Sequence, residues 1–337
     1  PVLGGVIADS LGWRWLFWVN VPIGLAGSWA GFALLRKEAK PTVREHFDVI
    51  GALAGVLFLG AIVTTFNSVG TQGWANPDVV VGFVVMLLVG PFFFWWERRI
   101  ETPILDLTLF HDRLFAWASA ASFLNQAVRF GLLLFVALIY QSLHGLSAAQ
   151  AGLVVLPVAI GTMVSSPWAG TLERRVSSGD ISRGGAYLTL GGILVCTGMI
   201  WLPSWYVFVV VGGFVAGFGG GMVITANTSA IMSRAPRDRL GVVSSLRVML
   251  QSLGVILGSA GILTAVTAAL PTNGKSAVYA GSGSLPAQYR HDLALGVPIA
   301  LGLLVVLSIG TIFTSRQAYL GYQVQIDEPS AEGRSAE

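Results

Sequence analysis

A charged residue inside an otherwise apolar stretch is the first feature of this sequence that could carry chemistry. Arg129 lies deep in the apolar stretch 114–139, and Asn125 precedes it by four residues. Because residues four apart share one face of a helix, we expect the amide and the guanidinium to point the same way. Such a pair can bind the polar part of a small molecule, since buried charges in a membrane are costly and by default functional. The structural alternative is an arginine that bonds to backbone carbonyls or to a neighbouring helix.

A second polar pair lies in the apolar stretch 240–270. Arg247 and Gln251 are again four residues apart, but Arg247 is near one end of the stretch, where its long side chain can reach the membrane surface. Asn227 follows the glycine-rich segment 217–221 and either faces a cavity or bonds to an adjacent helix. We expect a substrate cavity lined by Asn125, Arg129, Asn227, Arg247 and Gln251, with a structural role as the alternative for each.

The residue types that enzymes use for catalysis form no recognisable group. The four histidines lie in loops or at the ends of apolar stretches, far apart in the sequence, and no HExxH, GxSxG or P-loop motif is present. The single cysteine, Cys196, excludes an intrachain disulfide and a cysteine-based metal site. We therefore expect no enzymatic activity, no metal ion and no cofactor.

The elements that position these residues must be membrane helices. The chain has 337 residues, of which 54% are apolar and 11% charged, with a mean hydropathy of +0.72; soluble domains carry about 25% charged residues. A membrane span needs about 20 apolar residues, and nine stretches qualify: 15–35, 49–69, 79–96, 114–139, 151–172, 184–202, 206–232, 240–270 and 293–315. With a shorter piece at 1–11, they predict an all-α polytopic membrane helix bundle whose partner is the lipid bilayer.

The distribution of positive charge predicts the orientation. The formal net charge is +3, and fifteen of the 20 lysines and arginines lie in alternate loops or the tail, whereas three lie in the other loops. Positive residues in short loops concentrate on the cytoplasmic side, so we expect a multi-pass protein of the plasma (inner) membrane with a cytoplasmic C-terminus. Because these residues form no continuous basic patch, we expect no nucleic-acid binding. The polar tail, 316–337, has no periodicity and is expected to be disordered.

A glycine-rich motif opens the chain. Pro1, Gly4 and Gly5 are followed by Gly12-Trp-Arg-Trp-Leu-Phe and by Asn20-Val-Pro-Ile-Gly. The arrangement resembles the end of the antiporter motif on the fifth helix of the fourteen-span drug:H+ antiporters in the major facilitator superfamily. The usual preceding glycine of that motif is missing, so we expect the chain to lack the N-terminal part of such a protein.

The rest of the sequence resembles the same family in order. Tyr140-Gln141, Gly145, Ala151-Gly-Leu and Pro157 match it beyond the motif. The resemblance implies that residues 1–35 end an N-terminal six-helix bundle and that 36–113 hold two linker transmembrane helices with cytoplasmic loops. It also implies that 114–315 form a C-terminal six-helix bundle.

A second, degenerate motif lies in the loop after residue 169. Gly170, Glu173, Arg174 and Arg175 are similar to the GxLxxR cytoplasmic loop of these transporters. An acid beside arginines at a helix end can form a latch that differs between inward-open and outward-open states. The alternative is ordinary positive charge on the cytoplasmic side.

The resemblance implies a secondary active transporter, with proton-coupled efflux of drugs or other small amphipathic or cationic compounds. The alternatives are an exporter of one endogenous metabolite or lipid, and a membrane scaffold or sensor that transports nothing. No carboxylate lies in the middle of an apolar stretch. Asp9 and Asp292 are therefore the proton-coupling candidates, with a solvated charge at a helix end as the alternative for each.

Overall fold

The computed structural model describes residues 2–34, 48–72, 76–100, 105, 107–198, 205–235, 239–279 and 286–327. These residues form helices and no strands, as the composition predicts. The helices are α1 (Val2–Leu11), α2 (Trp15–Trp18), α3 (Asn20–Leu34), α4 (Val49–Gln72), α5 (Pro77–Glu97), a 3-10 turn η1 (Leu107–His111), α6 (Arg113–His144), α7 (Ala148–Leu172), α8 (Ser178–Thr197), α9 (Trp205–Arg234), α10 (Leu240–Val266), α11 (Thr272–Tyr279) and α12 (Ala287–Asp327).

Eight helical segments in the described ranges are long and apolar enough to cross a membrane. They coincide with eight of the nine predicted stretches. The ninth, 184–202, is helical as α8 as far as Thr197, and residues 199–204 lie outside the described ranges. The last helix differs from expectation: α12 continues to Asp327, so the tail predicted to be disordered from residue 316 is helical over that part. Residues 328–337 lie outside the described ranges.

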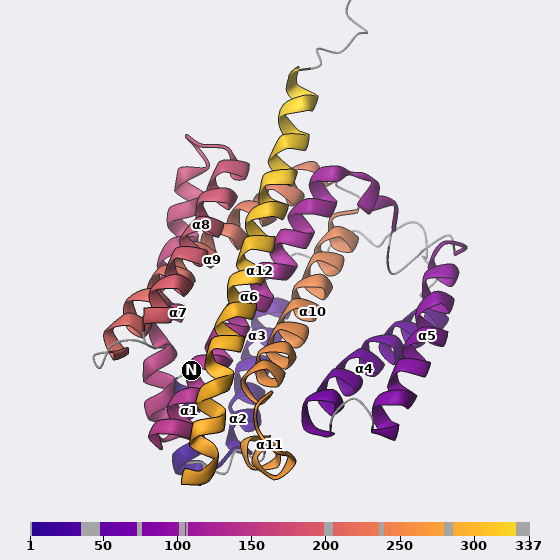
Figure 1. The fold of residues 1–337 in the computed structure, drawn as a ribbon. Coiled ribbons are helices and arrows are strands. Elements are labelled where there is room, and N and C mark those ends of the chain that lie inside the picture. The colour runs from indigo at the N-terminus through magenta and orange to yellow at the C-terminus, as the bar shows by residue number, and fades with distance from the viewer. Residues whose placement is uncertain are drawn as a thin grey trace, which may run out of the picture.

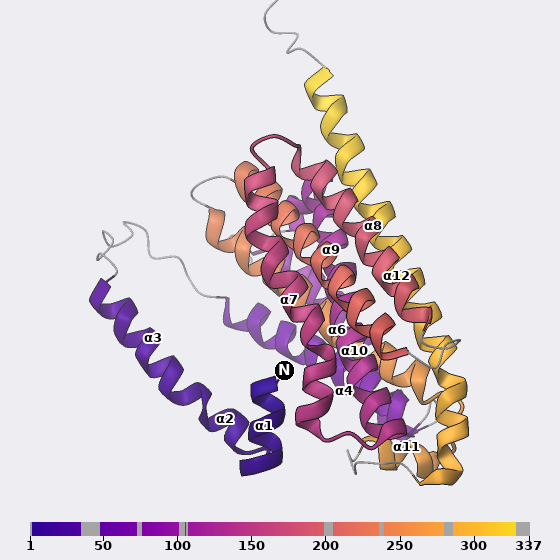
Figure 2. The ribbon, with the colours of Figure 1, turned by 90° about the vertical axis from the view of Figure 1, so that its left-hand side faces the viewer.

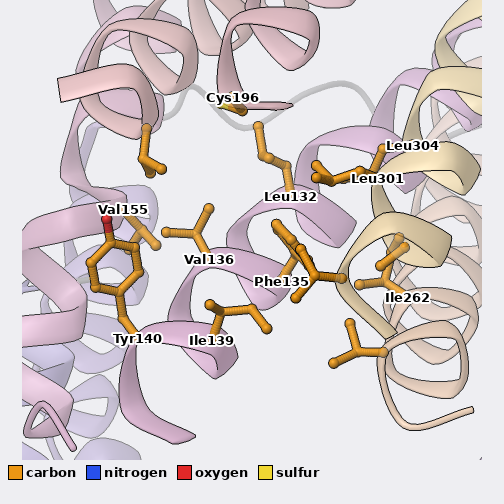
Figure 3. Packing of buried hydrophobic residues seen from close by; sticks show 14 of the residues in the cluster. Leu132, Phe135, Val136, Ile139, Tyr140, Val155, Cys196, Ile262, Leu301 and Leu304 are labelled. Carbon is orange, nitrogen blue, oxygen red and sulfur yellow. The ribbon is translucent and has the colours of Figure 1, made fainter. Parts of the chain in front are cut away.

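Helix α6 forms a bundle with the long helices α7, α8, α9, α10 and α12 (Figure 1). Helix α6 packs against α7, α9, α10 and α12, while α8 packs against α9 and α12. Leu132, Phe135 and Ile139 of α6 are fully buried and meet Ile262 of α10 and Leu304 of α12 (Figure 3). The polar residues near the middle of α6 are therefore held on one of the two most buried helices of the bundle.

Glycines bring the backbones of α8 and α9 into direct contact. A methyl group added at Gly192 would lie 2.5 Å from the Gly212 carbonyl oxygen and 2.8 Å from Ala216 Cα. The same holds at Gly185, where it would lie 2.6 Å from the Gly219 carbonyl oxygen. Small residues allow such close approach in lipid, where helices associate by packing rather than by exclusion of water. Helices α8 and α9 therefore form a tightly matched pair.

Helices α4 and α5 form a separate hairpin (Figure 1), which contacts the bundle through α10 and α11. Asp48 and Glu97, which the sequence places at the ends of apolar stretches, are 5% and 3% exposed. The Asp48 carboxylate accepts hydrogen bonds from Gly51 N at 2.8 Å and from Trp96 Nε1 at 3.0 and 3.1 Å. Glu97 Oε2 accepts from Leu105 N at 2.9 Å. These buried carboxylates join the two helices and the following loop.

Trp96→Phe is expected to weaken this hairpin. The change removes the Nε1 donor while it keeps an aromatic ring, so the buried Asp48 carboxylate loses a hydrogen bond. Such a loss costs about 1–3 kcal/mol, and the purified chain should unfold at a lower temperature. Trp95→Phe is the matched control, because Trp95 is 47% exposed and a phenyl ring can still lie against Arg99. Equal decreases in the unfolding temperature of the two variants would show that the Trp96–Asp48 hydrogen bond does not stabilise the hairpin.

Candidate functional site

Asn125 and Arg129 lie near the middle of α6 and face α9. Asn125 is fully buried, and its Nδ2 donates to the Gly220 carbonyl oxygen at 3.1 Å. Arg129 is partly exposed, and its Nε donates to Gln126 Oε1 at 3.1 Å. A methyl group at Gly220 would lie 3.4 Å from Asn125 Oδ1 and 3.9 Å from Arg129 Cδ, so this glycine leaves room for both side chains. The predicted pair on one helix face is present.

Arg247 and Gln251 lie on α10, which also packs against α6. Arg247 Nη1 donates to Thr228 Oγ1 of α9 at 3.2 Å. One turn beyond Gln251, a methyl group at Gly254 would lie 3.3 Å from Gln126 Cβ, so this part of α10 lies directly against the polar part of α6. Sequence reasoning did not single out Gln126 or Thr228, although the three-residue spacing between Gln126 and Arg129 was a usable signal.

These residues form two groups on packed helices, one on α6 and one between α9 and α10, which we together call the polar seam. It consists of Asn125, Gln126 and Arg129 of α6, Thr228 of α9, and Arg247 and Gln251 of α10. Three of its buried polar atoms have no hydrogen-bond partner in the structure: Asn125 Oδ1, Arg247 Nε and Gln251 Nε2. Since buried polar groups are nearly always hydrogen-bonded, these three atoms are candidates for hydrogen bonds to a further polar group.

Asn227 lies outside the seam and bonds to the neighbouring helix. Its Nδ2 donates to the Ala118 carbonyl oxygen and to Ser122 Oγ, both at 3.2 Å. The same residue lines a cavity of about 240 Å³ inside the bundle, among α6, α8, α9 and α12. Ser182 and Ser315, which hydrogen-bond each other at 3.1 Å, lie on its wall. This cavity was not predicted, because its lining comes from four separate helices and the turn between α7 and α8.

The opening motif contacts α7 (Figure 2). Gly5 is buried, and a methyl group there would lie 2.5 Å from the Ala148 carbonyl oxygen and 2.6 Å from Ala149 Cα. At Gly4 the nearest atom would be Leu16 Cδ2 at 3.8 Å. Only Gly5 is therefore needed for the close approach of the two helices. Pro1 lies outside the described residues.

Asp9 reinforces the same contact. The exposed carboxylate accepts a hydrogen bond from Ala149 N at 2.8 Å, at the N-terminus of α7, where the helix dipole favours negative charge. Asp9 lies outside the eight candidate spans. Hydrogen bonds from the Ala149 backbone and the Ser147 side chain lower the pKa of its carboxyl. The ionised form of Asp9 is thus the form that contacts α7.

Asp9→Asn is expected to loosen the end of α7. The amide of Ala149 should exchange with solvent about twofold to fivefold faster, because an uncharged acceptor interacts more weakly with a helix N-terminus. Since the folded-state pKa of Asp9 is lowered, the wild-type contact exists above the ordinary carboxyl pKa and is lost as the pH falls through the lowered value. Ser10→Ala is the control, because the Ser10 hydroxyl donates only within α1, to Val6. Unchanged exchange at Ala149 in Asp9→Asn would refute this role.

The second motif lies at the turn between α7 and α8. Gly170, Arg174 and Arg175 are exposed, while Glu173 Oε1 accepts from Ser178 Oγ at 3.3 Å. In the described part of the chain, the ion pair at this turn joins Asp180 to Arg183, within α8. The predicted pairing of Glu173 with the adjacent arginines is not present in this conformation. Asp292 is half-buried in the second turn of α12. In the sequence it lies more than 100 residues after both the opening motif and the motif at the α7–α8 turn.

Apolar helices of membrane-spanning length, packed through glycines around a polar seam, define a multi-pass α-helical membrane protein. Its family follows from comparison with known sequences: residues 1–259 match the Major Facilitator Superfamily, and the chain belongs to that superfamily. The predicted resemblance is thereby confirmed, and the bilayer is the medium of the protein.

Several curated proteins resemble the chain over most of its length. "Uncharacterized MFS-type transporter EfpA" of Mycobacterium tuberculosis (strain ATCC 25618 / H37Rv) is 30% identical over 332 residues, 96% of this chain and 60% of that protein. "Multidrug resistance protein 3" of Bacillus subtilis (strain 168) is 29% identical, over 77% of this chain and 50% of its own length. "Multidrug export protein EmrB" of Escherichia coli (strain K12) is 28% identical, over 82% and 53%. The chain thus spans 60% or less of these relatives.

Proposed function

We propose that the protein is a secondary active transporter that exports drugs or other small amphipathic compounds, driven by the proton gradient across the plasma membrane. The observation that carries this proposal is the polar seam, with its unpaired buried polar atoms, on helices of a superfamily bundle. Two of the relatives named above are called multidrug resistance or export proteins, which supports the substrate class. No enzymatic step is part of the proposal.

The proposed cycle is a rocking of two bundles around a site near the middle of the membrane. We assign α1 to α3 to the end of one bundle, α4 and α5 to the linker, and α6 to α12 to the other bundle. The close contact of Gly5 with α7 then joins the two bundles at the end that the charge distribution places outside. In this arrangement the C-terminus is cytoplasmic. Substrate reaches the seam from the opposite end.

Proton coupling in this scheme falls to Asp292, because Asp9 is held ionised by the α7 N-terminus. Asp292 lies at the outer end of its span and is half-buried. The turn of Gly170, Glu173, Arg174 and Arg175 is proposed to change its pairing between the inward-open and outward-open states.

Efflux from cells that express the gene encoding this chain tests the function. Cells should accumulate less of a fluorescent amphipathic dye than cells with empty vector, and an uncoupler that collapses the proton gradient should remove the difference. A panel of anionic, neutral and cationic dyes covers the charge classes. If no dye in the panel shows uncoupler-sensitive efflux while the protein is present in the membrane, the proposal fails.

A further inference from the structure

On the basis of the proposed transport function, we propose that the polar seam binds the negatively charged head group of an amphipathic solute, a carboxylate or phosphate, in preference to a cation. The inference departs from the expectation of a cationic substrate. It concerns the charge that the site accepts, and it rests on the charges and unpaired atoms of the seam itself.

The seam offers mainly donors. Its two guanidinium groups belong to Arg129 and Arg247, and its unpaired atoms include Arg247 Nε and Gln251 Nε2, both N–H donors. Arginine presents a planar fork of N–H groups that matches the two oxygens of a carboxylate or phosphate. An oxyanion would accept the hydrogen bonds that these donors lack.

No carboxylate balances the two arginines in the described part of the bundle. Between residues 113 and 327, the described acidic residues are Glu173, Asp180, Asp292 and Asp327, and they lie within two turns of a helix end or in the turn between α7 and α8. A cation beside either arginine would meet a like charge in a medium of low dielectric constant, where repulsion is strong. An anion would instead neutralise charge that is costly to hold within a membrane.

The two arginines lie at different levels along α9. Arg129 packs against Gly220 of α9, whereas Arg247 bonds to Thr228 of the same helix. These α9 positions are eight residues apart, which is about 12 Å along a helix. Arg247 lies near the start of α10, and Arg129 lies deeper. Arg129, Arg247 and Gln251 are each partly exposed. In this proposal a head group therefore pairs with one guanidinium at a time.

Direct binding to the full chain in phosphatidylcholine nanodiscs tests the proposal. The probes are three fluorescent amphiphiles with the same alkyl chain that end in a carboxylate, a methyl ester or a trimethylammonium group. Fluorescence anisotropy should show the carboxylate binding at least about tenfold more tightly than the trimethylammonium probe, as a charge-assisted pair requires. Equal affinities, or tighter binding of the cation, would overturn the inference.

Variants locate the site. Arg129→Gln and Arg247→Gln should each weaken carboxylate binding about tenfold and leave the ester unaffected, while Arg247→Lys should keep most of the affinity. Arg316→Gln, a change at an exposed arginine of α12, is the control. Unfolding temperatures show which variants remain folded. If folded Gln variants bind the carboxylate as the wild type does, the seam is not the anion site.

The same binding assay distinguishes a lipid head group from a free amphiphile. Together with the efflux assay, it also tests the anion site and the transport function separately. Competition by phosphatidylglycerol in the nanodisc would assign the head group to a lipid, and lack of competition would assign it to a free amphiphile; both results support an anion site. Efflux of cationic dyes together with cation-preferring binding would overturn only the inference. Carboxylate binding without efflux of any dye would overturn only the transport function.

Discussion

Gly5→Leu should abolish export, whereas Gly4→Leu should leave most of it intact. A side chain at Gly5 would overlap the backbone of Ala148 and Ala149, and backbone atoms at a helix N-terminus cannot move aside without displacing α7. At Gly4 the nearest atom is the flexible end of Leu16, at 3.8 Å. The two glycines are neighbours in the motif, and the sequence alone assigns them the same role.

The deciding measurement is export, substrate binding and membrane abundance for both variants, side by side. We expect Gly5→Leu to retain abundance and binding and to lose at least about tenfold in export rate, because it disfavours the state in which α1 and α7 touch. Parallel loss of all three quantities would indicate a folding defect. Equal export by the two variants would show that the close approach does not matter to the cycle.

Arg129→Ala should reduce export about tenfold to hundredfold, and Arg129→Lys should restore part of it. The alanine variant loses a charged donor that is worth about 1.5–3 kcal/mol in a hydrogen bond to a bound group. It also leaves Gln126 Oε1 without the Arg129 Nε donor. Lysine keeps the charge but not the planar fork.

Arg316→Ala serves as the control for general loss of positive charge, since Arg316 is exposed on α12. Initial efflux rates, normalised to protein in the membrane, give the comparison. If Arg129→Ala exports at the wild-type rate at equal abundance, Arg129 is a structural residue and the functional interpretation of the seam is wrong.

The sequence predicted what depends on one helix at a time. Hydropathy located the membrane helices, and four-residue spacing placed Asn125 with Arg129 and Arg247 with Gln251. The contacts between helices could not be predicted from the sequence. The difference between Gly4 and Gly5 depends on how α1 is rotated against α7, and the burial of Asp48 and Glu97 depends on how α4 and α5 meet. Neither rotation is encoded in local spacing.

The end of α12 and the role of Thr228 were also not predicted from the sequence. A run of polar residues after 316 predicted disorder, yet α12 continues to Asp327. Thr228 was missed because its partner, Arg247, lies on another helix, nineteen residues away. Residues whose role consists of one long-range hydrogen bond leave no periodic pattern in the sequence.

The backbone contact between α8 and α9 has a consequence for how the sequence can drift. Any single-base change in a glycine codon that replaces the glycine with another amino acid introduces a residue with a Cβ atom. At Gly192, Gly212 and Gly219 that atom would overlap main-chain atoms of the opposite helix. Even alanine, the smallest replacement, is therefore not accommodated. Gly191 and Gly302, beside which a Cβ would find open space, have no such restriction. Neutral variation among natural sequences should therefore be confined to the outward-facing glycines, while the glycines between α8 and α9 stay unchanged.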